Sequence, residues 1–497
     1  MKSILRILRE PAFIICVIFV ILPFCFATFV PSTDLPQHLA QIRLLEEILQ
    51  NPEQTTYKVN WFGANVLIYY LLGFNWLIFS PIATGKITLI ELTLLWILSI
   101  FILCKKKDGN FASAAIASTF VFNLSLYWGF LNFLIGFPIF TIWYIYVIAP
   151  NKNANQLKTF ALTVIISLLL FLAHTLWFIV SIACLAAITV YRYNQWRNYI
   201  PQWLGLMPTV VVSAFWFPSF AKTRATLGFD TEAHWFENPL QRLLPKWIFE
   251  SLLGGIKSPI EIVVILIIFL WIVLCIKNNF NRIKAKIDRD YVIISIILAM
   301  IVLFAPDKYV NTIYFSSRWA PVAIIFFLLS LPTPLKQKNR MVLLSFIPII
   351  VLSIVTSYYW YKFDKEENSG LSESLDRIPK RARVIGLDFV RESKYIKGRP
   401  FLQTFAYSQV LHGGELNFSF AEHHSGIVSY RYRRIFRWTT GLEWEAGWVQ
   451  KSDFKQFDIS LINAKEFLHN LFPERLELQP ITNTGRWRIY NTRKIER

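Results

Sequence analysis

Long apolar segments separated by short polar ones dominate the first 361 residues of the chain. Many of these segments approach the roughly 20 residues that a helix needs to cross a hydrocarbon layer about 30 Å thick. The first lacks a clear cleavage site, which favours an uncleaved anchor over a signal peptide. We predict eleven membrane-spanning helices, at residues 11–30, 83–104, 110–127, 129–149, 159–174, 176–191, 200–219, 258–276, 291–305, 319–332 and 341–361.

The basic residues between the apolar segments predict an orientation, because short cytoplasmic loops are enriched in Lys and Arg. With a cytoplasmic N-terminus, every strongly basic short loop falls on the inner side. Residues 65–80 are then a helix in the outer leaflet, and residues 159–191 form two short helices that meet near His174. The basic residues on the inner side are Lys105, Lys106, Lys107, Lys152, Lys158, Arg192, Arg197, Lys277, Arg282, Lys284, Lys286, Arg289, Lys336, Lys338 and Arg340.

Residues 362–497 are polar and contain no apolar run of spanning length. Alternating and β-branched residues predict strands at 382–389 and 457–462, a helix at 466–471, and a hairpin of 476–481 with 487–490. The sequence thus predicts an all-α polytopic membrane domain, residues 1–361, followed by a soluble α/β or α+β domain, residues 362–497. This second domain would lie outside the membrane, opposite the N-terminus.

Composition supports a membrane protein, since 55% hydrophobic and 16% aromatic residues exceed what one soluble core can bury. The net charge of +19 comes largely from the predicted inner loops, so no nucleic-acid partner is needed to explain it. The cysteines all lie within or at the ends of predicted spans, which indicates neither a disulfide framework nor a metal site. They are Cys16, Cys25, Cys104, Cys184 and Cys275.

One further basic cluster lies in the polar C-terminal part, where arginines are interleaved with aromatic residues. It is either an anion-binding patch or a strand with a solvated basic face, and we favour the strand. Its members are Tyr430, Arg431, Tyr432, Arg433, Arg434, Phe436, Arg437 and Trp438.

Asp34 follows the first apolar segment, on the predicted outer side, in the run Ser32-Thr33-Asp34-Leu35-Pro36-Gln37-His38. A carboxylate at that level can meet both the head of a lipid-linked substrate and a water-borne acceptor. Alternatively, Asp34 caps the predicted surface helix at residues 37–50, because Pro36 suits the first turn of a helix. The chemistry of these residues leaves catalysis and capping both open.

The order of these features resembles the GT-C superfamily of integral-membrane glycosyltransferases, which includes protein mannosyltransferases and lipid A aminoarabinose transferases. The resemblance covers roughly residues 1–360: an N-terminal span, an outer loop with an acid, a surface helix, the apolar stretch Tyr69-Tyr70-Leu71-Leu72, and a span that ends in a basic inner loop. Asp34 matches the acid of that loop, and His38 completes a D-x-P-x-H form. Many members have paired acids where this chain has Asp34-Leu35, so the resemblance implies no certain cofactor and leaves a divalent metal ion open.

The resemblance implies transfer of a sugar from a polyprenyl-phosphate donor to a glycan, lipid or protein acceptor, at the outer face of a plasma (inner) membrane. Asp34 would be the base, and Arg318 would grip the donor phosphate. Arg318 is alternatively an interfacial arginine beside Trp319, and His174 is alternatively hydrogen-bonded within the bundle. The further candidates for substrate binding are His38, His174, Lys222 and Arg224, the last two being alternatively interface anchors.

Two other classes of function stay open. A transporter or flippase for a lipid-linked saccharide would have charged residues deep in several spans and repeated halves. Only Glu91 is clearly inside a predicted span, and no half-repeat is visible. A non-catalytic membrane subunit would use its outer domain to bind a partner and Asp34 as a cap. The sequence identifies neither the sugar nor the acceptor nor the oligomeric state.

Overall fold

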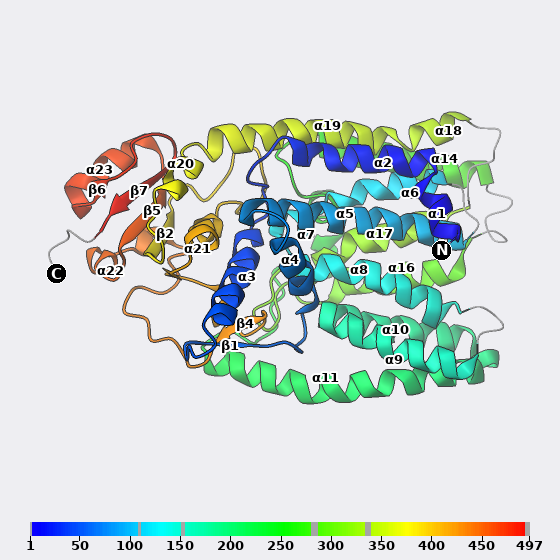
Figure 1. Ribbon diagram of the computed structural model, residues 1–497. Helices are drawn as coiled ribbons and strands as arrows, with labels where there is room; N and C mark the ends of the chain where they lie inside the picture. Colours follow the sequence, from blue (N-terminus) through cyan, green and yellow to red (C-terminus); the bar gives the residue numbers. More distant parts are fainter. Residues whose placement is uncertain (1, 108–110, 151–154, 280–286, 333–338, 493–497) are drawn as a thin grey trace. The chain divides into compact units, whose positions relative to one another are not determined.

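The computed structural model describes residues 2–107, 111–150, 155–279, 287–332 and 339–492 (Figure 1). The chain forms two compact units that alternate along the sequence. The first unit comprises Met1–Pro23, Ile90–Leu126 and Leu131–Thr356. The second comprises Phe24–Leu89, Tyr127–Phe130 and Ser357–Arg497. Among the basic residues of the predicted inner loops, Lys152, Arg282, Lys284, Lys286, Lys336 and Lys338 lie outside the described residues.

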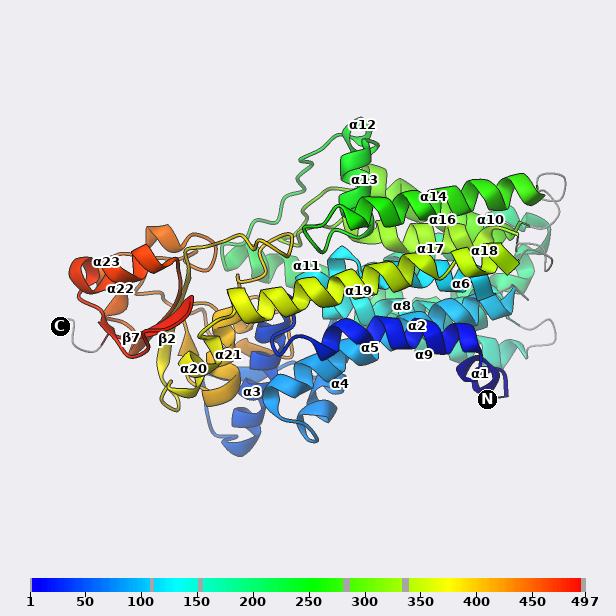
Figure 2. The same ribbon diagram turned by 90° about the horizontal axis from the view of Figure 1, so that it is seen from above.

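The first unit is a helical bundle. In Figure 1, α8 (Leu131–Trp143), α9 (Gln156–Ala173), α10 (Thr175–Tyr191) and α11 (Ile200–Thr226) run side by side, and α9 packs against the other three. In Figure 2, α16 (Arg289–Phe304) runs along α17 (Ala320–Ser330). Other helices with residues in this unit include α2 (Pro11–Ile21), α5 (Pro81–Lys106), α6 (Phe111–Ala117), α14 (Ile260–Asn279) and α19 (Ile347–Lys362).

Trp177 on α10 lies at the centre of this bundle and is fully buried. Its ring centroid is 5.3 Å from that of Phe133 and 5.2 Å from that of Phe140, and its indole nitrogen donates to the Phe133 carbonyl at 2.9 Å. A Cβ on Gly136 would lie 1.9 Å from the indole ring, so α8 needs a glycine here to approach α10. This close aromatic packing between α8 and α10 explains why both helices are almost wholly apolar.

Within the described residues, seven helical segments are long and apolar enough to cross a membrane. They are Pro81–Lys106, Phe111–Trp128, Leu131–Ile148, Gln156–Ala173, Tyr193–Thr226, Ile260–Lys277 and Val342–Glu367, and three shorter apolar helices cover Pro11–Cys25, Thr175–Tyr191 and Ser317–Ser330. Each of the eleven predicted spans overlaps at least one helix among the described residues, and the number of crossings stays a prediction. The predicted break near His174 is confirmed, because α9 ends at Ala173 and α10 begins at Thr175.

The second unit contains a mixed five-stranded sheet with the order β3-β2-β5-β7-β6. Strand β2 (Arg383–Asp388) is parallel to β3 (Glu415–Leu416) and to the central strand β5 (Ile459–Asn463), while β7 (Trp487–Asn491) is antiparallel to β5 and β6 (Gln479–Pro480). Its helices include α20 (Leu371–Asp376), α21 (Tyr407–His412), α22 (Lys451–Phe454) and α23 (Glu466–Leu476). The predicted strands, helix and hairpin of this region are confirmed (Figure 1).

The same unit also contains α3 (Leu35–Gln50), β1 (Tyr57–Val59) and α4 (Leu67–Trp76). Strand β1 pairs antiparallel with β4 (Val428–Tyr430). The ten residues of α4 rise only about 15 Å, half of a hydrocarbon layer, which agrees with a helix that does not cross. The second unit therefore joins residues from both sides of residue 361, and the functional boundary predicted there stays a prediction.

The predicted strand through the interleaved arginines is wrong, because β4 ends at Tyr430, before the first of them. Arg434 turns inward, stacks 4.7 Å from the Trp438 ring and donates to the Glu422 carboxylate at 3.1 Å. Arg431 and Arg437 are exposed. Basic and aromatic residues alternate here because aromatic rings surround the Arg434 guanidinium. In the sequence, this alternation cannot be distinguished from that of a half-buried strand.

Candidate active site around Asp34

Asp34 interrupts an otherwise buried segment of the second unit. From Phe29 to Ile42 every residue is buried except Asp34, which is half-buried. Its amide donates to the Trp128 carbonyl at 3.0 Å, and the Thr33 amide donates to the Tyr127 carbonyl at 2.9 Å. The short segment 127–130 thus holds the backbone on which the carboxylate is presented.

Gly129 makes this close contact possible. Its φ of +75° is in the left-handed region that favours glycine. A Cβ at this position would lie 2.9 Å from the Asp34 amide nitrogen and 2.9 Å from the Ser32 hydroxyl oxygen. No larger residue fits without moving residues 31–34, which we call the Asp34 loop. In the sequence, Trp128-Gly129 carried no signal of this role.

The capping alternative is not supported by the local geometry. Asp34 occupies the position before α3, but its side chain makes no capping hydrogen bond to that helix in the described structure. Its φ of −88° and ψ of −8° are helical, whereas N-cap residues are typically extended. The carboxylate is therefore not used to satisfy the first-turn amides of α3.

His38 lies one helical turn beyond Asp34 and is 5% exposed. Its Nδ1 is 3.0 Å from the Tyr69 hydroxyl on α4, its ring also hydrogen-bonds the backbone of Gly129, and it meets Phe420 edge-on at 5.4 Å. Burial lowers the pKa of His38 to about 4, so the ring is neutral at physiological pH. His38 therefore joins α3, α4 and the segment 127–130 directly beside the acid.

Tyr69 is the third residue of the candidate site, together with Asp34 and His38. It is 2% exposed, and burial, with a smaller contribution from Asp34, raises the pKa of its hydroxyl. Sequence reasoning used this tyrosine only as part of an apolar stretch. A hydroxyl in such a stretch needs a buried partner, and this requirement was the available signal.

Two glutamines on α3 bind the helix to the C-terminal part of the same unit. Gln37 donates to the Gln403 side chain at 2.9 Å and accepts from the Phe420 amide at 3.1 Å. Gln41 accepts from the Val428 amide at 2.8 Å. Helix α3, which directly follows Asp34, is thus attached to residues 403–428 of the same unit through buried polar contacts. The spacing of four residues between the glutamines places both on one helix face, but their partners are more than 360 positions away.

In the first unit, Arg318 and His174 flank one aromatic ring. The Arg318 guanidinium is 5.5 Å from the Phe133 ring centroid, and the His174 ring meets Phe133 edge-on at 5.9 Å. Arg318 is 3% exposed, and donates through Nε to the Tyr314 carbonyl at 2.9 Å and through Nη2 to the Ile313 carbonyl. The His174 Nδ1 accepts from the Leu176 amide at 3.2 Å and caps α10.

Lys222 and Arg224, near the end of α11, have different environments. Lys222 is exposed, whereas Arg224 is buried and donates to the Val310 carbonyl at 2.6 Å. Val310 and Tyr314 have φ values of 46° and 51°, which is unusual for a β-branched or bulky residue. Two of the predicted arginines therefore hold one strained loop, because Arg224 and Arg318 both donate to its carbonyls.

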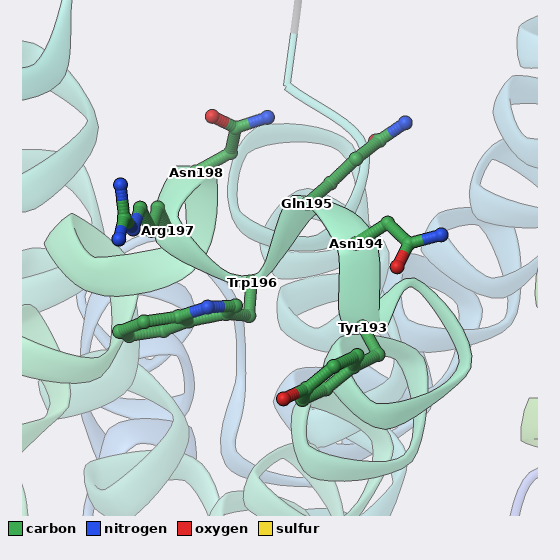
Figure 3. A pocket seen from close by; sticks show the side chains of 6 residues that line it. All are labelled: Tyr193, Asn194, Gln195, Trp196, Arg197 and Asn198. Carbon is green, nitrogen blue, oxygen red and sulfur yellow. The ribbon is translucent and has the colours of Figure 1, made fainter.

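Two other features fall outside these groups. In the described part of the chain, no three His, Cys, Asp or Glu side chains are grouped as a metal site would require. A shallow pocket of about 420 Å³ lies on the turn between α10 and α11 and is lined by Tyr193, Asn194, Gln195, Trp196, Arg197 and Asn198. In Figure 3 the rings of Tyr193 and Trp196 lie on one side of this turn, and the amides of Gln195 and Asn198 on the other. None of the predicted site residues lines it.

No family model matches the chain, and no curated protein matches it in sequence. Its fold is similar to that of ArnT from Cupriavidus metallidurans, whose crystal structure was solved in the apo state. The two structures superpose with a TM-score of 0.52 and 9% sequence identity, over 96% of this chain and 97% of that one. At this identity the likeness concerns the fold alone. The chain therefore has an ArnT-like fold, and seven of its described helical segments are long and apolar enough to cross a membrane, which agrees with the predicted polytopic helical architecture.

Proposed function

We propose that the protein is a glycosyltransferase that moves a sugar from a polyprenyl-phosphate donor to an acceptor at the outer face of the plasma membrane. In this proposal the N-terminus is cytoplasmic and the C-terminal part lies outside. One observation carries it: in a GT-C-like fold, Asp34 alone emerges from the buried segment 29–42, and its carboxylate does not cap α3.

Sugar transfer from a lipid phosphate needs a base and a stabilised leaving group. The acceptor hydroxyl attacks the anomeric carbon, the carbon–oxygen bond to phosphate breaks, and the phosphate leaves with the bonding electrons. Asp34 takes the proton of the attacking hydroxyl, which requires an approach of about 2.6–3.2 Å. A half-buried carboxylate at the water boundary is able to receive this proton.

The neighbours of Asp34 have a positioning role in this proposal. His38 is buried and neutral, and its ring bonds to Tyr69 and Gly129 fix the turn that carries the acid. A rigid support of this kind matters because a displacement of about 1 Å costs roughly 100-fold in rate. Contact between His38 and the substrate itself stays a prediction.

Arg318 is the proposed ligand of the donor phosphate, with His174, Lys222 and Arg224 as further binding residues. The guanidinium of Arg318 donates to two loop carbonyls through Nε and Nη2, and it carries five N–H donors in all. A phosphate offers a charge-assisted, bidentate partner that a carbonyl cannot match.

The test is transfer from polyprenyl-phosphate sugars by the full-length protein in proteoliposomes, with donor binding measured separately. Asp34→Asn is expected to lower transfer by about 10²- to 10⁴-fold with donor binding unchanged, because only the proton acceptor is lost. Glu53→Gln is the matched control, since Glu53 is an exposed acid just beyond α3 in the same unit. Full transfer by Asp34→Asn would exclude Asp34 as the base. Lipid movement without transfer would instead favour a flippase.

A further inference from the structure

The carboxyl ends of two parallel strands in the second unit carry buried polar side chains. Asp388 ends β2 and Asn463 ends β5, and the two residues are paired in register. The Asn463 amide nitrogen donates to Asp388 Oδ1 at 2.9 Å. In open sheets with parallel strands, ligands bind beyond the carboxyl ends of those strands.

The hydrogen bonding of this pair is incomplete on one side. Asp388 is 6% exposed, and its Oδ1 accepts from the Val390 and Arg391 amides as well as from Asn463. Asp388 Oδ2 and Asn463 Oδ1 are both fully buried and have no hydrogen-bond partner in the described structure. Folded proteins leave few buried acceptors unpaired, so two of them on one pair of residues mark this strand end as a candidate binding position.

Arg399 and Trp444 add a donor and an apolar surface. The Arg399 guanidinium is 5.5 Å from the Trp444 ring centroid and donates through Nη2 to the Trp444 carbonyl at 2.8 Å. Its Nε is buried without a partner among the described residues. The Arg391 amide donates to Asp388 Oδ1, and the Arg391 guanidinium pairs with Glu445, the residue after Trp444. Burial raises the pKa of Asp388, and the Arg391 and Val390 amides and the charge of Arg399 partly oppose this. Trp444 is 39% exposed.

These groups match one ligand chemistry. The two unpaired acceptors require O–H or N–H donors and repel an anion such as phosphate, while Arg399 Nε requires an oxygen acceptor. Trp444 offers the exposed aromatic surface on which the C–H face of a sugar ring packs. A neutral, hydroxyl-rich sugar supplies all three.

The location of these residues connects them to the Asp34 loop in the same unit. The Thr33 hydroxyl, next to Asp34, donates to the Arg399 carbonyl at 3.4 Å. At Gly398, where φ is +75°, a Cβ would lie 3.4 Å from the indole nitrogen of Trp128, and the Trp128 carbonyl binds the Asp34 amide. The backbone that carries Arg399 therefore borders the loop that carries the acid.

We propose that Asp388, Asn463, Arg399 and Trp444 form a saccharide-binding site that holds a sugar acceptor next to Asp34. The acceptor role depends on the proposed function, whereas the binding of a saccharide does not. The two claims therefore need separate measurements.

Binding is tested by saturation-transfer NMR on the full-length protein in nanodiscs, with methyl glycosides of common hexoses and pentoses as probes. At least one glycoside is expected to bind with a Kd of about 1 mM or tighter. Trp444→Ala and Asp388→Asn should each weaken it by about tenfold or more, since the first removes the surface and the second replaces an acceptor by a donor. Trp448→Ala, at an exposed tryptophan of the same region, is the control and should bind normally. Thermal melting of each variant identifies any that misfold.

The site is refuted if no glycoside binds, which would leave the unpaired atoms to ordered water, or if Trp448→Ala weakens binding as much as Trp444→Ala. Asp34→Asn should bind the same glycoside with unchanged affinity. Saccharide binding without any transfer activity would overturn the proposed function and keep the site. Transfer that is insensitive to Trp444→Ala at low acceptor concentration would overturn the acceptor role.

Discussion

Gly129→Ala is the sharpest perturbation of the site, because it adds one methyl group against the Asp34 loop. An alanine here retains a left-handed φ, which costs about 1–2 kcal/mol. Its Cβ would meet the Asp34 nitrogen at 2.9 Å, against at least 3.4 Å for an ordinary contact, so the loop must move by about 0.5 Å. Overpacking of this size adds about 1–3 kcal/mol.

The expected result has two parts. The free energy of unfolding should fall by about 2–5 kcal/mol, the sum of the backbone and packing costs. Transfer measured well below the melting temperature should fall about tenfold, because a displacement of half an ångström misplaces the base. Melting in detergent and single-turnover transfer measure the two parts separately.

Gly73→Ala is the matched control, as Gly73 lies inside α4 of the same unit and nothing is within 4 Å of an added Cβ. This change should stabilise the helix by about 0.5–1 kcal/mol and leave transfer unaffected. Wild-type stability and transfer in Gly129→Ala would refute the close contact between segment 127–130 and the Asp34 loop. Lost stability with unchanged transfer would show that the exact position of the loop does not matter to the chemistry.

Two further predictions concern the buried polar groups of the second unit. Tyr69→Phe removes the hydroxyl that pairs with His38 Nδ1 and leaves a buried nitrogen unsatisfied, so stability should fall by about 1–3 kcal/mol; an unchanged melting temperature would argue against the bond. Burial raises the pKa of Glu422 to about 7, above an unfolded value of about 4.3, despite the opposing effect of Arg434. The fold therefore prefers the protonated acid, and stability should fall as pH rises from about 4.5 to about 7, by roughly 2–3 kcal/mol. Glu422→Gln should flatten this dependence in melting curves, and an equally steep curve in the variant would assign the effect to another group.

The helices and strands were largely accessible from sequence, because each depends on neighbours within a few residues. Apolar runs predicted the helices, the charges predicted the break at His174, and β-branched alternation predicted β2 and β5. Asp34 was found the same way, since its place after the first apolar segment is a local property. The resemblance to GT-C proteins, carried by the order of such local features, predicted the fold that the comparison with ArnT then supported.

Tertiary structure alone decided which of these elements share a unit and which polar groups form hydrogen bonds within the fold. Gln37 and Gln403 meet across 366 positions, and β1 pairs with β4 across a similar distance, so no local pattern announces them. Arg224, Arg318 and Arg434 look alike in sequence as basic residues near aromatic ones, yet each is hydrogen-bonded to partners that only packing supplies. Periodicity reports whether a residue faces an apolar or a polar environment, whereas the identity of a partner depends on the free energy of packing distant segments together. The same limit hid the unpaired oxygens of Asp388 and Asn463, which become visible only when two strand ends lie side by side.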